Sequence, residues 1–300
     1  MYSSVIDWLQ SPKVAPWWRI MRMDRPIGTL LLLWPTLTAL WLASDGLPSI
    51  KNILVFSIGA LVMRSAGCVI NDYADRKIDA HVERTAHRPL ATGEMRAGQA
   101  IFLFVLLLCV AFALVLTTNT LTVQLAFVGA GLAFCYPFMK RFTQLPQLVL
   151  GLAMNWGVVM AYAAESGQLS QEIFVFYAAT IAWTVAYDTF YAMVDRDDDL
   201  RIGVKSIAIL FGENDRLMIL ILQGLCTLAL LLTGARFELG LAWYIAVASV
   251  AALFFYQYRL TADRSKPHCF AAFVNNNWVG VVFFTGAVID SFITHFPFMP

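Results

Sequence analysis

Eight of the chain's twenty acidic residues lie in two short clusters. The first cluster spans residues 71–79 and the second spans residues 188–199, and each ends a hydrophobic run long enough to cross a bilayer. Carboxylates at a membrane boundary are costly, so they require a compensating cation, a charged partner or a function. Carboxylate and amide oxygens suit Mg²⁺, which keeps several waters and is commonly shared with substrate phosphates. The two clusters together predict two cations that bridge a diphosphate.

Helical spacing orders the first cluster. Asn71 and Asp75 are four residues apart and therefore share one helix face, with Asp72 and Asp79 flanking them. The carboxyl end of a helix carries partial negative charge, which strengthens the attraction for a cation. Helical phase therefore selects Asn71 and Asp75 as the inner pair.

The second cluster has a matching pattern. Asp188, Asp195 and Asp199 follow intervals of seven and four residues, which place them on one helix face. Asp197 points to the opposite side, so we expect it in solvent. Asp195 and Asp199 are the inner pair of this cluster.

Three other interpretations of the clusters compete. Either cluster alone is typical of a solvated loop, but two clusters with matching spacing are less typical of solvated loops. The second cluster resembles the start of an EF-hand calcium loop, but Leu200 and Ser206 replace the glycine and the closing glutamate that such a loop requires. Carboxylates within a membrane also serve as ion relays. A cation-coupled transporter is therefore the alternative from a different class, although no inverted repeat of broken spans is apparent.

The composition is that of a membrane protein. The chain is 59% hydrophobic and only 14% charged, whereas soluble domains carry about 25% charge. The net charge of +1 favours no nucleic-acid partner. We expect an all-α fold, polytopic in the membrane, with nine transmembrane helices in a single integral-membrane domain, residues 1–300. The predicted spans are 26–44, 52–70, 99–118, 121–138, 147–164, 173–194, 216–234, 239–258 and 269–290.

The Lys and Arg residues predict an orientation. One side of these spans carries 18 of the 21 basic residues and the other side carries 2, with Arg64 inside the second span. By the positive-inside rule the N-terminus is cytoplasmic and the C-terminus is periplasmic, in a bacterial inner membrane. No cleavable signal peptide is visible, so we expect the first span to direct insertion. Spans 52–70 and 173–194 both run inward, and both clusters therefore lie at cytoplasmic helix ends.

Basic residues surround the clusters on the predicted cytoplasmic side. A departing diphosphate needs several cations to hold its developing charge. Cations on this side also serve topology, which is the simpler explanation for any single one. No Gly-rich Walker loop is present, which argues against nucleotide-driven chemistry. The residues concerned are Arg84, Arg88, Lys140, Arg141, Arg201 and Lys205.

Two charges lie deeper in the predicted spans. Arg64 precedes Asn71 by seven residues, and Asp188 precedes Asp195 by the same interval. Both charges should therefore lie roughly two turns, about 10 Å, inside the inner pairs. Parallel neighbouring helices would let Arg64 and Asp188 form an ion pair, which relieves two costly charges. Alternatively, each faces the site separately and contacts a substrate.

Both clusters resemble the signatures of the UbiA-type membrane prenyltransferases. The first signature reads Asn71-x3-Asp75-x2-Ile78-Asp79-x2-Val82-x-Arg84-Thr85-x2-Arg88-x4-Gly93. The second reads Asp188-x2-Tyr191-Ala192-x2-Asp195-x3-Asp199. The resemblance extends over nearly the whole chain and includes residues 22–28, 136–147 and 202–208. The segments 136–141 and 191–205 resemble most the family members that use 4-hydroxybenzoate in ubiquinone biosynthesis.

The resemblance implies nine helices around a central cavity, Mg²⁺, a polyprenyl diphosphate donor and an aromatic acceptor. Carried onto this chain, Asn71 and Asp75 hold one metal, and Asp195 and Asp199 hold the other. Asp79 and Asp188 complete the catalytic carboxylates beside them. The acceptor ring is expected to attack through the carbon ortho to its hydroxyl, and other aromatic acceptors such as dihydroxynaphthoate or homogentisate are the alternatives.

The remaining site residues follow from the same resemblance and from charge. We expect the diphosphate to be bound by Arg84, Arg88, Lys140 and Lys205. We expect the acceptor to be contacted by Arg141, Arg64, Asp188 and Tyr191. Arg141 is the choice for the acceptor carboxylate, and Tyr191 is a candidate for cation–π stabilisation of the allylic cation, although a single aromatic on a helix face is more often simple packing.

Overall fold

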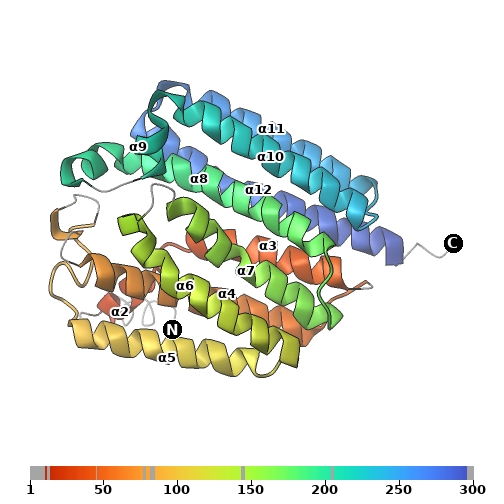
Figure 1. Cartoon of the computed structure of the whole chain (residues 1–300), viewed down its shortest axis with the longest axis horizontal. Helices are drawn as coiled ribbons and strands as arrows, with labels where there is room; N and C mark the ends of the chain where they lie inside the picture. Colours follow the sequence, from red (N-terminus) through yellow and green to blue (C-terminus); the bar gives the residue numbers. More distant parts are fainter. Residues whose placement is uncertain are drawn as a thin grey trace. The chain divides into compact units, whose positions relative to one another are not determined.

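All regular secondary structure in the described part of the chain is helical (Figure 1). This finding confirms the predicted all-α class. The computed structural model describes residues 11, 14–44, 46–76, 79–81, 85–142, 146–203 and 206–295. The chain divides into two compact units, of which unit 1 comprises residues 1–29 and 58–117 and unit 2 comprises residues 30–57 and 118–300. The single domain over residues 1–300 and the central cavity stay predictions.

Each predicted span coincides with one long apolar helix of the described chain. These helices are α3 (Ile27–Ala43), α4 (Ile50–Asp75), α5 (Ala97–Val115), α6 (Thr120–Phe142), α7 (Pro146–Ser166), α8 (Glu172–Ile202), α10 (Asp215–Arg236), α11 (Leu241–Leu260) and α12 (Lys266–His295). Seven stretches of the described chain are long and apolar enough to cross a membrane, and α3 and the start of α6 are shorter apolar helices. The chain is therefore a multi-span helical membrane protein.

The helix ends differ from the predicted spans at both acidic clusters. Helix α4 continues five residues beyond its predicted end, to Asp75, and α8 continues eight residues, to Ile202. Hydropathy falls where the acidic residues begin, but backbone hydrogen bonding does not depend on hydropathy. Both inner pairs therefore lie within α-helix. Short helical turns follow or precede the long helices: α2 (Ala15–Ile20), η1 (Asp79–His81), α9 (Ile207–Phe211), η2 (Gly212–Asn214) and η3 (Thr261–Asp263).

Unit 1 has a small apolar core of its own. Ile20 of α2 and Val69 of α4 are fully buried and pack with Met95 from the connection before α5. Ala100 and Leu103 supply the face of α5. This core therefore packs the short α2 helix and the connection before α5 against the second half of α4, close in sequence to the first acidic cluster.

Unit 2 is organised around three consecutive asparagines of α12, Asn275–Asn277. Their side-chain oxygens accept hydrogen bonds from Gln257 of α11, Trp183 of α8 and Trp34 of α3, at 2.9, 2.8 and 2.9 Å. Successive helix residues project about 100° apart, so three neighbours reach three different helices. Polar side chains between membrane helices form hydrogen bonds with one another because lipid offers them no partner. The asparagines therefore fix the rotation of α12 relative to its neighbours within unit 2. Figure 1 shows α12 running alongside α8 and α11.

Candidate active site

The first acidic cluster lies where α4 ends. Asn71, Asp72 and Asp75 belong to the last turns of α4, so Asn71 and Asp75 share a helix face as predicted. Asn71 and Asp75 are both partly buried. Asp79 lies beyond the helix, in the 3₁₀ turn η1. It therefore reaches the cluster from an irregular connection and not from the face of α4.

Two arginines bind the flanking carboxylates of this cluster. The Asp72 side chain is 1% exposed, and both its oxygens accept from Nη2 of Arg22, at 2.8 and 2.9 Å. Arg88 Nη1 lies 3.0 Å from Asp72 and 2.8 Å from Asp79. Arg88, predicted to bind diphosphate, thus sits beside the first cluster and links its two flanking carboxylates. The role of Arg22 is not predicted by the spacing of the cluster, and its only signal in the sequence is its place in the 22–28 motif.

The carboxylates around η1 are crowded. Burial raises the pKa of Asp79 above its usual value, and the nearby charges of Asp72 and Asp75 raise it further. The hydrogen-bonded guanidinium of Arg88 lowers the pKa but does not restore it. The side chains gathered here offer carboxylate and amide oxygens as donors. This arrangement suits a hard divalent cation.

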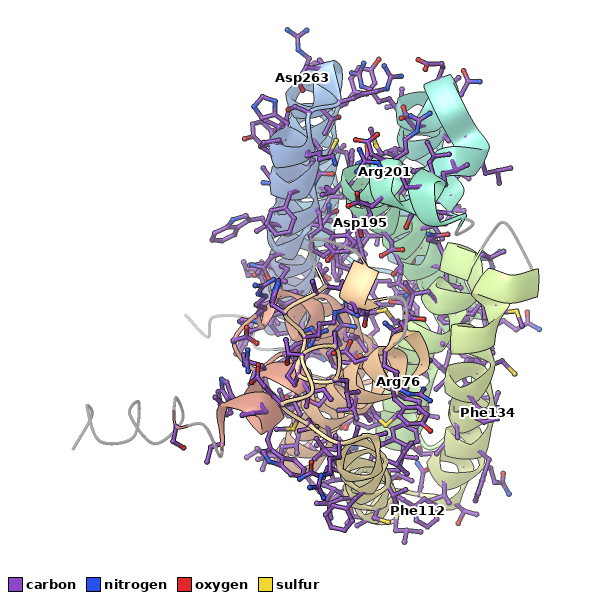
Figure 2. The ribbon with its side chains drawn as sticks, turned by 90° about the vertical axis from the view of Figure 1, so that its left-hand side faces the viewer. Arg76, Phe112, Phe134, Asp195, Arg201 and Asp263 are labelled. Carbon is purple, nitrogen blue, oxygen red and sulfur yellow. The ribbon has the colours of Figure 1, made fainter. Side chains whose placement is uncertain are left out.

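The second acidic cluster lies within a single uninterrupted helix. Helix α8 runs through the whole cluster, so Asp188, Asp195 and Asp199 occupy one helix face, and each is partly buried. Figure 2 shows Asp195 on α8, with Arg201 further along the same helix. Asp197 is 63% exposed and lies 3.2 Å from Nζ of Lys266. The prediction that Asp197 is solvated is therefore confirmed.

An aromatic stripe on α8 fixes the direction of this acidic face. Trp183, Tyr187 and Tyr191 recur every four residues and lie against α12. The Phe273 ring centre lies 4.9 Å from that of Tyr191 and 6.0 Å from that of Tyr187. Asp195 is about 40–120° from the stripe by helical phase. Tyr191, predicted to contact the acceptor, packs on Phe273, and its contact with substrate stays a prediction.

A buried carboxylate at the start of α10 binds the end of α8. Asp215 is fully buried and its oxygens lie 2.9 Å from Nε of Arg264 and 3.5 Å from Nη1 of Arg196. Arg196 directly follows Asp195, so this network anchors the chain beside a predicted metal ligand.

A cavity of about 230 Å³ lies beside Asp215 and Arg196. Three cations and three carboxylates line it, so its charge is balanced: Arg196, Arg264, Lys266, Asp197, Glu213 and Asp215.

The other predicted basic residues are only partly placed. Arg84 and Lys205 lie outside the described residues. Lys140 and Arg141 belong to the last turn of α6, and their side chains lie outside the described part. Arg64 is partly buried in α4, as predicted. Its proposed pairing with Asp188 stays a prediction.

The Arg64 guanidinium rests directly on Gly28 of α3. A Cβ atom added at Gly28 would lie 2.4 Å from Arg64 Nε and 2.7 Å from Cζ. Side-chain atoms are not tolerated at such distances, so a larger residue here would displace the guanidinium. Gly28 closes the 22–28 motif, and this contact gives a physical reason for glycine at its end.

Comparisons with known proteins identify the family. Residues 32–285 match the model of the UbiA prenyltransferase family. The chain belongs to this family. A 4-hydroxybenzoate octaprenyltransferase of Saccharophagus degradans is 56% identical over 277 residues, which are 92% of this chain and 93% of that protein. A protein of the same name from Ectopseudomonas mendocina is 54% identical over 279 residues, 93% of this chain and 94% of that one.

Solved structures of the UbiA family have the same fold. The apo structure of a UbiA homologue from Aeropyrum pernix K1 matches with a TM-score of 0.76 and 23% identity, over 88% of this chain and 97% of that one. A UbiA homologue from Archaeoglobus fulgidus, bound to DMAPP and Mg²⁺, matches with a TM-score of 0.71 and 14% identity. That match covers 92% of this chain and 98% of the homologue. These likenesses support the helical fold of the family.

The donor set of this UbiA-family chain fits Mg²⁺ shared with a substrate. Among the described residues, no three side chains of His, Cys, Asp or Glu converge to hold a metal by themselves. Each inner pair supplies two oxygen-bearing side chains instead. Mg²⁺ is commonly held by one or two carboxylates and completes its octahedron with water and phosphate oxygens. Two protein ligands per ion therefore suit a site that fills only when a diphosphate binds.

Proposed function

We propose that this protein transfers a polyprenyl group from polyprenyl diphosphate to the ring carbon ortho to the hydroxyl of 4-hydroxybenzoate, as a step of ubiquinone biosynthesis. The observation that carries the proposal is the likeness to named 4-hydroxybenzoate octaprenyltransferases at 56% and 54% identity over nearly the full length of both chains. Their name also supports an octaprenyl donor. The acidic clusters supply the diphosphate chemistry that this reaction requires.

The inner pairs are the proposed metal ligands. Asn71 and Asp75 would hold one Mg²⁺, and Asp195 and Asp199 the other. Bound Mg²⁺ would neutralise the negative charge that grows on the diphosphate as the diphosphate departs. The Archaeoglobus fulgidus homologue, which is bound to DMAPP and Mg²⁺, supports Mg²⁺ as the metal. Asp79 and Asp188 act beside the ligands, and Asp79 does so through the guanidinium of Arg88.

The chemistry requires little covalent participation by the protein. The bond between the allylic carbon and the diphosphate oxygen breaks, a carbon–carbon bond forms at the acceptor ring, and the ring then loses a proton. Side chains of Arg84, Arg88, Lys140 and Lys205 would hold the leaving diphosphate. Apolar helices exclude water, which would otherwise capture the allylic cation. Rate enhancement therefore comes from positioning and charge stabilisation.

Arg64 and Arg141 are the proposed cations for the acceptor carboxylate. Arg64 is a charge within a membrane helix, and such charges are functional by default because they are costly. The missing side chain at Gly28 leaves the space that its guanidinium occupies, which supports a defined task for Arg64. Asp188 and Tyr191 would complete the acceptor contacts. The proposed location is the cytoplasmic side of a bacterial inner membrane, with a cytoplasmic N-terminus and a periplasmic C-terminus.

Product analysis tests the proposal. The purified protein in nanodiscs receives 4-hydroxybenzoate, Mg²⁺ and a mixture of polyprenyl diphosphates, and the products are read by mass spectrometry. We expect 3-octaprenyl-4-hydroxybenzoate and stoichiometric diphosphate. Prenylation of dihydroxynaphthoate or homogentisate in preference to 4-hydroxybenzoate would reassign the acceptor. The absence of any prenylated product from folded protein would overturn the proposed function.

A further inference from the structure

Asp72 lies beside both proposed ligands of the first metal but is turned to other partners. It follows Asn71 directly and precedes Asp75 by three residues, so on α4 it is about 100° from one and about 60° from the other. Its side chain is almost fully buried. A buried ionised carboxylate needs both a counter-charge and hydrogen bonds. Asp72 therefore has a structural requirement that its two neighbours do not share.

Arg22 and Arg88 meet that requirement. One nitrogen of Arg22 donates to both Asp72 oxygens, at 2.8 and 2.9 Å. Arg88 lies 3.0 Å from Asp72 and 2.8 Å from Asp79. The Arg22 side chain is 21% exposed, so this pair is poorly screened by solvent. The chain of contacts Arg22–Asp72–Arg88–Asp79 thus joins both flanking carboxylates of the cluster.

The backbone at Arg22 is held in an unusual conformation that directs its side chain. Its φ is +57°, in the left-handed region that non-glycine residues seldom occupy. The turn around it is closed by hydrogen bonds from Arg22 Nη1 to the Arg19 carbonyl at 2.9 Å and from Met23 N to the Trp18 carbonyl at 3.2 Å. Ser65 of α4 donates to the carbonyl of Met21 at 3.4 Å. A strained backbone conformation persists only where several surrounding contacts hold it, and such residues cluster at functional sites.

We propose that Arg22 and Asp72 form a positioning pair that sets the conformation of the first acidic cluster. With both oxygens bound by Arg22, Asp72 is held away from the metal, and Asn71 and Asp75 alone face it. Arg88 is then free to divide its contacts between Asp72 and Asp79. Loss of Arg22 leaves Asp72 to draw Arg88 away from Asp79 or to turn toward the metal. The part about the metal rests on the proposed function of Asn71 and Asp75.

The test compares Arg22→Met with Arg25→Met. Arg25 lies in the same segment and carries the same charge, but its side chain is 66% exposed and its ion pair with Asp24 is 3.6 Å long. The full-length proteins in nanodiscs are titrated with Mn²⁺ in the presence of inorganic diphosphate, and binding is read by electron paramagnetic resonance. We expect Arg22→Met to weaken Mn²⁺ binding about tenfold, and Arg25→Met to bind as the wild type does. Equal affinity in Arg22→Met and the wild type overturns the proposal.

A second measurement needs neither metal nor activity. Amide hydrogen exchange of residues 68–76 in the metal-free protein reports the order of the last turns of α4. Faster exchange is expected in Arg22→Met only, with the helices of unit 2 unchanged. An unchanged exchange rate in residues 68–76 overturns the proposal that Arg22 and Asp72 act as a positioning pair. Loss of Mn²⁺ binding in Asp75→Ala is the separate test of the ligand assignment, so a failure of the proposed function is recognised independently.

A double-mutant cycle distinguishes a pair from two independent structural residues. Asp72→Asn keeps the shape of the side chain and removes its charge, which also provides a variant if Arg22→Met does not fold. We expect the double variant Arg22→Met/Asp72→Asn to bind Mn²⁺ no worse than Arg22→Met alone, because a pair is lost only once. Arg22→Lys keeps the charge without the guanidinium geometry and should recover part of the affinity. Additive losses in the cycle would overturn the proposal.

Discussion

The acidic cluster at the end of α4 and the one within α8 offer similar ligands but are held by different forces. At α4 the helix ends at Asp75, and arginines bind Asp72 in its last turns and Asp79 in the 3₁₀ turn beyond it. At α8 the helix continues through the cluster, and rings of α8 and α12 fix its rotation. The cluster at the end of a helix is therefore surrounded mainly by charge pairs, whereas the cluster inside a continuous helix is oriented mainly by ring packing on a neighbouring face. Variants of the two regions should therefore fail in different ways.

The inner carboxylates should be equally indispensable despite these different supports. We expect Asp75→Ala and Asp195→Ala each to lower Mg²⁺-dependent prenyl transfer by about 1,000-fold or more, because each removes a ligand of the charge-neutralising ions. The measurement is product formed per folded protein under saturating substrates. Asp197→Ala is the matched control on α8, since Asp197 is exposed, and should keep nearly full activity. Substantial transfer by either inner-pair variant would refute a shared two-metal site.

Packing variants should affect the second cluster through stability. Phe273→Ala empties the space beneath Tyr191 and Tyr187, and we expect it to lower the free energy of unfolding by about 3–5 kcal/mol. The loss should not depend on salt, because it comes from lost packing. Thermal unfolding at two ionic strengths measures it. Phe255→Ala, at a 64% exposed ring of α11, is the control and should cost far less. A salt-dependent loss in Phe273→Ala would argue against packing as the support of α8.

Gly28→Ala tests the position of the Arg64 charge. The added methyl group meets the mobile end of a side chain, so the helix should fold while the guanidinium moves. We expect the KM for 4-hydroxybenzoate to rise about tenfold, or about 1.4 kcal/mol, with the KM for the donor unchanged. Gly67→Ala on α4 has open space around its Cβ and serves as the control. An unchanged acceptor KM in Gly28→Ala would separate Arg64 from acceptor binding.

The smallest expected effect lies in the asparagine contacts of α12. Asn276→Leu leaves the buried indole N–H of Trp183 without its acceptor, which should cost about 1 kcal/mol of stability. Replacing both partners, in Trp183→Phe/Asn276→Leu, should cost less than the sum of the two single changes, because the hydrogen bond is lost only once. Denaturation in mild detergent compares the variants. A loss in the double variant equal to that sum would show that the rings, and not the hydrogen bond, orient α8.

Much of the fold was predictable from local patterns. Hydrophobic runs predicted every long helix, because apolar length is what a bilayer selects. The helical phase of Asp188, Asp195 and Asp199, and the exposure of Asp197, followed from spacing alone. Helices α4 and α8 continue beyond the predicted spans 52–70 and 173–194, because hydropathy falls at the first carboxylates while the backbone hydrogen bonds continue.

The amino-acid sequence by itself determined the all-helical membrane class, the two acidic clusters and their inner pairs, because these depend on runs and intervals within one segment. Only the tertiary structure decided the contacts made across long separations. Arg22 meets Asp72 across fifty residues of chain, Arg64 rests on Gly28, and Tyr191 packs on Phe273. Such contacts depend on which helix faces meet and on the left-handed turn at Arg22. The residue periodicity of a single helix predicts neither of these.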